Sequence, residues 1–499
     1  MTIEGQNRRW TLLAVCVTTF MLLVDITIVN VALPSIQRRL GASLTGLEWV
    51  VDAYAITLAA LILTAGALAD RFGRRSVFVV GIVVFTSASF LCGVAWNIAA
   101  LDIARALQGV GGAALFATAL ALIGAEYQGA ERGRAIAVWG ATVGLAVAAG
   151  PLVGGVLTDS LGWRWIFFVN VPIGVIALAV AVRKVRESRD PAASRTDLAG
   201  LVCFSAALFL IIYGLLRGNA LGWATVQIIA ALAAGLVLLV IFVAVERRQE
   251  RPMLDVSLFR QPAFLGVQLA TFCLGAGMFA LLPFLSIYLQ NVDRYSPLGA
   301  GLRFLPITVF VFVVPLMTRR FAATIALRTL LASSLGLIAL GLLLMEVVSV
   351  RSHWTVLLPG FIVAGIGIGL ANPTIAGAAL RVVDPSRTGM ASGISNTSRV
   401  GGLAIGVAIL GASLQQRVGD RLAAAGHSGK ALAAAVSSAG IHAVSNHPSL
   451  IPIAHAAFVS GFRLILAVCI ATLIVGALAA ALLVRARPQA PAAAPSSLS

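Results

Sequence analysis

Long, nearly uncharged apolar stretches follow one another along this sequence and limit its fold more than any other feature. About 20 apolar residues in a helix cross the roughly 30 Å of hydrocarbon in a bilayer, and soluble folds rarely contain many such stretches. Of the 499 residues, 60% are hydrophobic and only 11% are charged, whereas a soluble domain carries about 25% charged residues. A water-soluble globular fold is therefore excluded, and we expect an all-α integral membrane protein.

Fourteen of these stretches are long enough to span a membrane as helices, with ends that can shift by a few residues. An even number of spans places both termini on the same side of the membrane. The expected spans are residues 10–32, 47–69, 77–95, 100–124, 135–158, 165–182, 197–216, 223–245, 263–290, 298–318, 329–347, 354–380, 391–414 and 458–484.

Basic residues exceed acidic ones, with 36 Lys and Arg against 19 Asp and Glu, for a net charge of +17. A nucleic-acid-binding protein would gather them in one patch, but here they fall in short clusters between the apolar stretches, at residues 8–9, 71–75, 183–186 and 485–487. Loops rich in Lys and Arg remain on the cytoplasmic side of a membrane. The charge therefore predicts a multi-pass protein of the cytoplasmic membrane, surrounded by lipid, with both termini cytoplasmic and no nucleic-acid partner.

Two polar segments indicate how the chain is divided. Residues 183–197 lie between the sixth and seventh expected spans, where they could form a hinge, and residues 415–457 form a long, Ala-rich external segment. The predicted domains are an N-terminal six-helix bundle at 1–184, a linker with two inserted helices at 185–250, a C-terminal six-helix bundle at 251–484 that contains the external loop 415–457, and a disordered cytoplasmic tail at 485–499.

Several chemistries lack the residues that they need. No G-x-x-x-x-G-K-[ST] stretch could hold ATP phosphates, and residues 109–114, which fit G-x-G-x-x-A, lie inside an apolar span without a preceding strand. Neither H-E-x-x-H nor G-x-S-x-G occurs. The histidines of the external segment and the five cysteines show no metal-ligand spacing. We therefore expect no enzyme activity, no cofactor, no metal and no direct use of ATP.

Ionisable residues inside the apolar spans are informative, because a charge in the bilayer is costly and usually marks function. Asp25 lies about 10 Å, and Asp52 and Arg105 about 8 Å, below the outer ends of their expected helices. All three can therefore share one layer, in which one carboxylate stays paired with Arg105 while the other takes up and releases a proton. The alternative is a static ion pair between Asp25 and Arg105, with Asp52 near the interface beside Glu48 and Trp49.

The second half of the chain has fewer charged groups within its spans. Arg303, Arg399 and Arg463 have no acidic residue at comparable depth and could serve a substrate, helix packing or the membrane interface. No second acid is therefore expected to recognise a dicationic substrate. The polar residues that could line a central substrate cavity are Asn30, Tyr54, Gln108, Gln268, Asn372, Asn396 and Arg399.

Four motifs resemble those of one known family. Residues 66–75, GALADRFGRR, resemble the signature loop of the major facilitator superfamily at every fixed position. Residues 23–34, LVDITIVNVALP, resemble the first-helix motif of its fourteen-helix drug:proton antiporter branch. Residues 101–113, with Arg105, resemble the fourth-helix motif whose arginine is implicated in proton transfer, and residues 144–155 resemble the fifth-helix antiporter motif. Further stretches that look like the same branch are residues 163–174 and 389–411.

The resemblance implies two six-helix bundles that alternately open a central cavity to either side, with two helices inserted between them. The residues of the loop at 66–75 also predict a cytoplasmic latch, in which Asp70 sits at the N-terminus of the helix at 391–414 and Arg74 pairs with Asp70 or Glu126. The alternative is a turn whose arginines only hold the topology. The equivalent loop of the second half, residues 318–328, lacks the Asp and the glycines, so we expect no matching latch there. The residues of the latch are Gly66, Asp70, Arg71, Gly73, Arg74 and Glu126.

The glycines of the fifth-helix motif should provide a groove for close helix contact, while its proline removes a backbone hydrogen bond and allows a bend. The motif residues are Gly144, Gly150, Pro151, Gly154 and Gly155. The function that the resemblance implies is export of amphipathic or cationic drugs, dyes or a related metabolite, driven by the proton gradient. The alternative is proton-coupled uptake by a symporter of the same fold.

Overall fold

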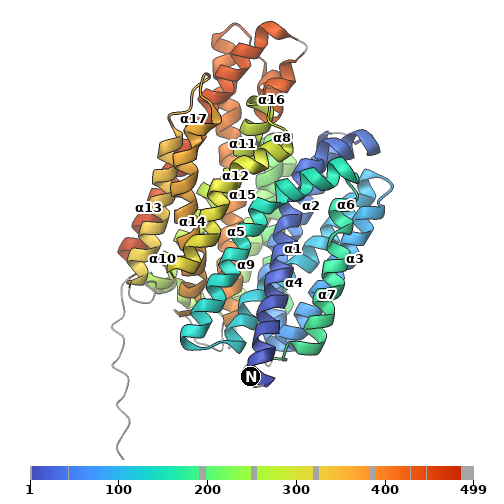
Figure 1. The fold of residues 1–499 in the computed structure, drawn as a ribbon, viewed down its shortest axis with the longest axis vertical. Helices are drawn as coiled ribbons and strands as arrows, with labels where there is room; N and C mark the ends of the chain where they lie inside the picture. The colour runs from blue at the N-terminus through green and yellow to red at the C-terminus, as the bar shows by residue number, and fades with distance from the viewer. Residues whose placement is uncertain are drawn as a thin grey trace, which may run out of the picture.

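The computed structural model describes residues 3–42, 44–189, 198–248, 256–318, 325–381, 388–427, 429–445 and 447–484. Helices form two bundles side by side, with a smaller helical part above one of them, and no strand occurs among these residues (Figure 1). The sequence forces this outcome, because in hydrocarbon a helix satisfies every backbone N–H and C=O within its own segment. The expected all-α fold with two bundles is confirmed.

The helices of the N-terminal bundle are α1 (Ile3–Leu40), α2 (Leu44–Phe72), α3 (Arg74–Val94), α4 (Ile98–Glu126), α5 (Gly129–Ser160), α6 (Trp165–Phe168) and α7 (Asn170–Lys184). A single residue, Gly73, separates α2 from α3, and its φ of 114° is a value that glycine alone adopts readily. α4 begins at a side-chain cap, where Asn97 Oδ1 accepts the Ala100 N–H at 2.8 Å.

The sixth expected span, residues 165–182, is broken into α6 and α7 at Val169. Near the break, the Phe167 carbonyl accepts a hydrogen bond from the Ser89 hydroxyl of α3 at 3.0 Å. This bond gives the Phe167 carbonyl a partner outside its own helix despite the interruption. The break turns Asn170, the first residue of α7, into the interior of the bundle, where it is 2% exposed.

Two inserted helices, α8 (Leu198–Leu221) and α9 (Val226–Glu246), follow the N-terminal bundle. α8 packs against α2 and also against α15 (Thr388–Ala424) of the second half. The Thr64 hydroxyl of α2 and the Ser205 hydroxyl of α8 are hydrogen-bonded at 2.7 Å. α9 packs on α8 and exposes large apolar side chains, among them Val237 and Val240, a surface suited to lipid. α8 therefore bridges the two bundles.

The elements of the C-terminal bundle are η1 (Val256–Arg260), α10 (Pro262–Leu274), η2 (Gly275–Phe279), α11 (Leu282–Ile287), η3 (Tyr288–Val292), α12 (Pro297–Thr318), α13 (Leu327–Met345), η4 (Trp354–Leu357), α14 (Leu358–Arg381), α15 and α17 (Ile451–Leu483). The expected span at 263–290 follows one path that two π-helical segments, η2 and η3, interrupt. In η2, the Ala280 N–H bonds the Gly275 carbonyl, five residues back, at 3.0 Å. Pro283 follows and has no N–H for an α-helical bond, which favours the irregularity.

α15 continues to Ala424, beyond the expected end at residue 414, and rises into a part that we call the cap, at the top of Figure 1. The cap consists of the end of α15, α16 (Lys430–Ala439), η6 (Gly440–Val444) and η7 (Pro448–Leu450). Leu414, Val418 and Leu422 recur every fourth residue on α15 and are at most 1% exposed. The apolar stripe of α15 therefore runs on into the cap, and the helix continues with it.

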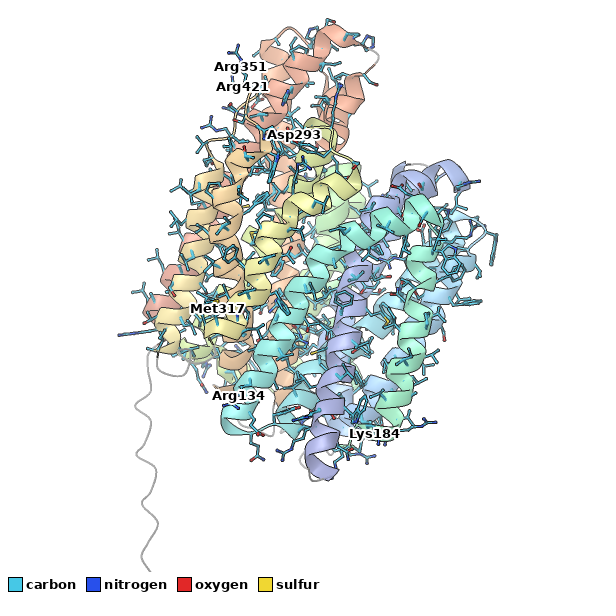
Figure 2. All side chains as sticks on the ribbon, in the orientation of Figure 1. Arg134, Lys184, Asp293, Met317, Arg351 and Arg421 are labelled. Carbon is cyan, nitrogen blue, oxygen red and sulfur yellow. The ribbon has the colours of Figure 1, made fainter. Side chains whose placement is uncertain are left out.

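Twelve helices of the described chain are long and apolar enough to cross a membrane. α5 and α8 are not among them, and α8 contributes only the shorter apolar helix Val202–Leu215. The count of fourteen spans therefore stays a prediction. Arg134 and Lys184 lie toward one end of the molecule and Arg351 and Arg421 at the other (Figure 2), as a protein with two water-facing ends requires.

Candidate functional site

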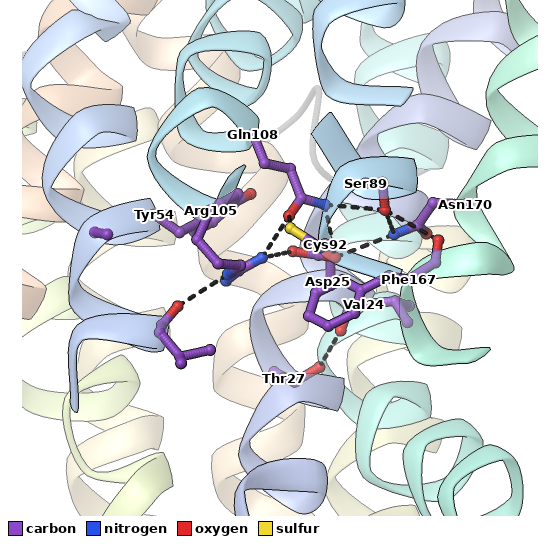
Figure 3. A network of polar contacts seen from close by, with 12 residues as sticks. Val24, Asp25, Thr27, Tyr54, Ser89, Cys92, Arg105, Gln108, Phe167 and Asn170 are labelled. Atoms are coloured by element: carbon purple, nitrogen blue, oxygen red, sulfur yellow. Dashed lines mark hydrogen bonds and ion pairs between the residues drawn. The ribbon is translucent and has the colours of Figure 1, made fainter. Parts of the chain in front are cut away.

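A fully buried polar cluster lies inside the N-terminal bundle, built from α1, α3, α4 and α7 (Figure 3). Asp25 of α1 is 0% exposed and Arg105 of α4 is 1% exposed. Gln108 follows Arg105 by three residues, so both side chains lie on one face of α4. Ser89 of α3 and Asn170 of α7 complete the cluster, and both are buried. Charges are rarely buried so deeply unless they are paired or functional.

Each oxygen of the Asp25 carboxylate is held by side chains of other helices. Oδ2 pairs with the Arg105 guanidinium, while Oδ1 accepts hydrogen bonds from Gln108 Nε2 at 2.9 Å and Asn170 Nδ2 at 3.0 Å. Arg105 also donates to the Val50 carbonyl at 2.9 Å and to Gln108 Oε1 at 2.7 Å. The structure thus brings Asp25 and Arg105 together in an ion pair, with Gln108 as a hydrogen-bond partner of both.

Ser89 links the amides of this cluster to the broken sixth span. Its hydroxyl accepts hydrogen bonds from Asn170 Nδ2 at 3.0 Å and from Gln108 Nε2 at 3.3 Å. The sequence reasoning missed both Ser89 and Asn170. The sequence does contain a signal for Asn170, because it is an amide in the middle of the otherwise apolar stretch at 165–182. A polar group at such a position in a membrane span needs a partner.

Tyr54 of α2 lies against the other face of Arg105. The Tyr54 ring centroid is 4.2 Å from Arg105 Cζ, a distance suited to a cation–π contact. The Tyr54 hydroxyl is buried, and no hydrogen-bond partner reaches it from the described residues. A methyl group on Gly112 would lie 3.2 Å from this hydroxyl, so the glycine leaves room beside it. Tyr54 therefore keeps a polar group available next to the ion pair.

Protonation could change the charge of this cluster in one step. A proton on Asp25 would remove the counter-ion of Arg105 and turn one acceptor oxygen into a donor. Leaving one member of a buried pair without its partner costs roughly 3–5 kcal/mol. A proton on Asp25 would therefore favour a rearrangement of α1 against α4.

Asp52 does not join this cluster. It faces α8, where Asp52 Oδ2 lies 3.8 Å from Arg217 Nη1. The rings of Trp49 and Tyr213 stack nearby with centroids 5.9 Å apart. The depth of Asp52 along α2 predicted that it shares a layer with Asp25 and Arg105, but the direction of a side chain also depends on its angle around the helix axis. Tyr54 faces Arg105, and Asp52, two positions earlier, points about 200° away from Tyr54.

The sequence did not predict a buried Arg217, because the expected seventh span ends at residue 216 and Arg217 was therefore placed in a loop. In the structure it lies inside α8, where it is 3% exposed. Its Cζ is 5.3 Å from the centroid of the Trp49 ring. Arg217 therefore connects the inserted helix to α2 through a charge and an aromatic ring.

The residues of the expected latch lie around the turn between α2 and α3. Arg74 donates to Asp70 Oδ1 from Nε at 2.9 Å and from Nη2 at 2.8 Å. Asp70, one of the two expected partners of Arg74, is therefore the one that pairs with it in the structure. α15 packs along α2, and a methyl group on Gly393 would lie 2.9 Å from Leu63 Cδ1. Contact of Asp70 with the first turn of α15 stays a prediction, because the side chains of residues 388–392 lie outside the described ones. The other latch residues are Gly66 inside α2, Arg71 with its Cζ 4.9 Å from the Phe72 ring, and Glu126 at the end of α4.

A carboxylate that the sequence reasoning missed fixes the start of α3. Glu187, just after α7, accepts the backbone N–H groups of Arg75 and Ser76 at 3.0 and 3.1 Å. The first N–H groups of a helix have no partner within it, so this bond caps α3 from another segment. A methyl group on Gly73 would lie 2.5 Å from Glu187 Cδ. Glycine is therefore needed here for both its φ and its size.

The glycine motif of α5 mediates close contacts on two sides. α5 packs on α1 on one side and on α12 and α14 on the other. A methyl group on Gly154 would lie 2.8 Å from Ile28 Cγ1 of α1, and one on Gly150 would collide with Thr27. One on Gly144 would collide with Val311 of α12, so this glycine lets the two bundles approach each other. The remaining motif residues are Gly155, which is buried, and Pro151, whose side chain lies outside the described residues.

The expected cavity residues of the second bundle differ in how well they are satisfied. Gln268 of α10 donates to Ser395 Oγ at 3.2 Å and accepts from Ser398 Oγ at 3.0 Å, which ties α10 to α15. The side chain of Asn30, in the first bundle, lies outside the described residues. Three others are buried with polar atoms that no described residue partners: Asn372 with both amide atoms, Asn396 with Nδ2 and Arg399 with Nε.

A separate charged group lies at the end of the molecule that carries the cap. Burial raises the pKa of Asp293, which follows η3, to about 6, although Tyr288, His353 and Arg303 act in the opposite direction. Arg303 Cζ lies 3.3 Å from the centroid of the Tyr295 ring. Arg463 and Glu346 both lie near the expected outer ends of their spans. Arg463 Nε is 3.4 Å from Glu346 Oε2, in a partly exposed ion pair. Arg303 thus contacts the Tyr295 ring and Arg463 pairs with Glu346 near this end of the bundle.

Two helical bundles, a charge pair buried in one of them and a glycine-lined contact between them define a multi-pass membrane transporter. The chain belongs to the Major Facilitator Superfamily, whose family model matches residues 15–407. The human organic anion transporter MFSD10 has a solved structure that matches with a TM-score of 0.61 at 15% identity, covering 93% of this chain and 99% of that chain. At this identity the likeness supports the fold alone.

Several curated relatives are bacterial resistance proteins. Multidrug resistance protein Stp of Mycobacterium tuberculosis is 38% identical over 406 residues, which cover 81% of this chain and 75% of that protein. Puromycin resistance protein pur8 of Streptomyces alboniger is 38% identical over 410 residues, covering 81% of each chain. The tetracenomycin C resistance and export protein of Streptomyces glaucescens is 34% identical over 431 residues, covering 83% of this chain and 78% of that protein.

Proposed function

We propose that this protein exports amphipathic or cationic drugs, dyes or a related metabolite across the cytoplasmic membrane in exchange for protons, by alternating access. Relatives named for puromycin resistance and for tetracenomycin C export support this direction of transport. The proposal includes no catalysis, no cofactor and no ATP. Both termini lie in the cytoplasm, where the basic loops of the chain belong.

One observation carries the proposal: the Asp25–Arg105 pair is completely buried between helices that must move during transport. In the paired state, Asp25 holds α1 to α4 and α7 through Arg105, Gln108 and Asn170. A proton that enters from outside neutralises Asp25 and releases Arg105. Loss of that proton to the cytoplasm restores the pair, which couples one direction of the cycle to proton entry.

The packing of α5 supports a route from this pair to the second bundle. α1 carries Asp25, and its neighbouring residues Thr27 and Ile28 press on the glycines of α5. α5 also meets Val311 of α12, through Gly144. Closely packed helices shift as rigid bodies rather than deforming continuously. A displacement of α1 would therefore reach the interface between the bundles through a single helix.

The proton gradient is sufficient for this work. A membrane potential supplies about 2.3 kcal/mol per elementary charge per 100 mV. Since about 1.36 kcal/mol corresponds to a factor of ten, each charge that moves inward through 100 mV could support a concentration gradient of roughly 50-fold for the exported compound.

Proton movement in everted membrane vesicles tests the proposal. The compounds are ethidium, puromycin and tetracenomycin C, and the variants are Asp25→Asn and a matched control, Asp159→Asn, which changes an exposed carboxylate at the end of α5. We expect the wild type and the control to release protons from the vesicle lumen when a transported compound is added, and Asp25→Asn to release none. Coupled proton movement in Asp25→Asn would refute the assignment, and compound and proton leaving the lumen together would establish symport instead.

A further inference from the structure

A buried guanidinium of the second bundle has no neutralising partner among the residues that the structure describes. Arg399 of α15 is 9% exposed, and within the described chain no carboxylate pairs with it and no acceptor reaches its Nε. The other deeply placed arginines differ, because Arg105 pairs with Asp25 and Arg217 lies beside Asp52. A charge held in a membrane interior without a partner is costly and marks a functional site by default.

Two amides lie at the same depth as this guanidinium. Asn396 precedes Arg399 by one helical turn, so both lie on neighbouring positions of one face of α15. At a rise of about 1.5 Å per residue, Asn396 and Arg399 lie about 12 and 17 Å from the start of α15, and Asn372 lies about 14 Å from the end of α14, which packs against it. Asn372 and Asn396 are 1% and 2% exposed, and each has amide atoms that no described residue partners.

The hydrophobic neighbours of these groups place them at the interface between the bundles. Ala376, one turn after Asn372 on α14, packs in a cluster of buried residues that otherwise come from the N-terminal bundle. Val400, one turn after Asn396 on α15, packs against the same cluster. Alternating access separates the two bundles along this interface. Asn372 and Asn396 would therefore become accessible in the course of the cycle, and Arg399 lies one turn from Asn396 on α15.

The first π-helical segment of the bundle lies directly beside Arg399. Gly275, the first residue of η2, closely approaches the Arg399 carbonyl, where a larger residue would collide. Phe279, the last residue of η2, places its ring centroid 5.9 Å from Arg399 Cζ. π-helical segments and interrupted membrane helices are frequent at ligand sites. η2 thus adds an aromatic surface to a cationic and hydrogen-bonding group.

We propose that Arg399, Asn372 and Asn396 form a subsite for an anionic oxygen of the exported compound, a carboxylate or a phenolate. The guanidinium pairs with the oxygen, the two amides donate hydrogen bonds to it, and an aromatic ring of the compound packs on Phe279. This inference rests on the proposed export function and deepens it, since among the amphipathic or cationic compounds proposed there it selects amphipathic ones that carry an anionic oxygen.

The charge of the substrate changes the energetics of exchange. When a monovalent anion leaves and a proton enters, two charges move inward per cycle, whereas exchange of a monovalent cation for a proton moves none. A membrane potential therefore drives anion export directly and leaves one-for-one cation export unaffected.

Equilibrium dye binding to the full-length protein in lipid nanodiscs at pH 8 tests the subsite. Rhodamine 6G and fluorescein ethyl ester share a xanthene core and an ethyl ester but differ in charge, and fluorescein adds a free carboxylate. We expect fluorescein ethyl ester or fluorescein to bind at least tenfold more tightly than rhodamine 6G, and Arg399→Gln to abolish this preference. The control Arg463→Gln changes the arginine paired with Glu346 and should keep it. Tight binding of fluorescein alone assigns the group as a carboxylate, and equal binding of both assigns a phenolate.

Two results would overturn the subsite: a preference of the wild type for rhodamine 6G, and an anion preference that survives in Arg399→Gln. If none of the dyes binds, thermal unfolding of the protein without dye tests whether Arg399 is an unpaired charge. Arg399→Met should raise the Tm by roughly 2 °C or more, because it removes an unpaired buried charge, whereas a lower Tm would reveal a structural partner and reject the subsite. Failure here with intact proton release in the vesicle assay would reject the subsite and retain proton-coupled export.

Discussion

Removing one member of the Asp25–Arg105 pair should destabilise the protein far more than removing both. In Arg105→Met, the Asp25 carboxylate keeps Gln108 and Asn170 as donors but loses its counter-charge at a position that is 0% exposed. Breaking a buried pair costs roughly 3–5 kcal/mol, whereas replacing both partners by apolar residues is neutral or stabilising by roughly 1–4 kcal/mol. In Asp25→Leu/Arg105→Met, both amides still have Ser89 as an acceptor. The double variant should therefore be more stable than Arg105→Met by at least ~3 kcal/mol.

The free energy of unfolding in mixed micelles, measured by titration with sodium dodecyl sulfate, gives this difference through a double-mutant cycle. The matched control is the cycle for Arg463→Met and Glu346→Leu, whose side chains are 56% and 22% exposed. An exposed pair of this kind should show a coupling of only about 0.2–1 kcal/mol. A coupling between Asp25 and Arg105 no larger than that of the control pair would refute the reasoning, since Arg105 would then be compensated by other groups.

Three further predictions follow from contacts described above. Gly73→Ala should lower the free energy of unfolding by roughly 1–3 kcal/mol, because alanine is strained at a φ of 114° and its methyl group meets Glu187; unchanged stability in the same micelle titration would contradict this. Gly144→Ala should slow dye export in vesicles at least tenfold through its collision with Val311, while Gly133→Ala, where a methyl group meets no atom within 4 Å, should not, and equal rates would exclude a role for this contact. The raised pKa of Asp293, about 6, means that its contribution to stability is fully present below the unfolded value of about 4 and is lost as the pH rises through about 6; the Tm of Asp293→Asn should lack this loss between pH 4 and 7, and a wild-type loss that persists in the variant would assign it to another group.

The sequence predicts the helices of this fold well because each membrane span satisfies its own backbone and so depends on local composition. Every expected span coincides with a helix or a run of helices. Depth along a helix also predicts the meeting of Asp25 and Arg105. It does not predict the partner of Asp52, because rotation about the axis of α2 depends on which helices surround it. Arg217 was hidden by an error of a few residues at the end of a span.

Interruptions within spans were the features that composition could not reveal. The break before Asn170 and the π-helical segment at Gly275 lie in stretches whose mean hydropathies, 2.4 and 2.0, fall within the range of 1.4 to 3.2 that the other spans cover. Both are stabilised by contacts from distant segments, such as the Ser89 hydroxyl on the Phe167 carbonyl. The Glu187 cap on α3 likewise joins residues more than a hundred positions apart. Such features depend on the packed state, and they are concentrated around the candidate sites.

α15 has a mechanical consequence for the whole molecule. It is a continuous helix of 37 residues, about 55 Å long at the usual rise, and it packs on α2 and α8 before its far end is built into the cap. A rod of this length that tilts by about 10° around its middle displaces each end by roughly 5 Å. In the membrane orientation proposed above, the cap is the outer arm of this lever and the other arm lies at the cytoplasmic end of the bundles. A fluorophore on α16 would report each half-cycle from the cell exterior, and an antibody fragment that clamps the cap would arrest transport without entering the membrane.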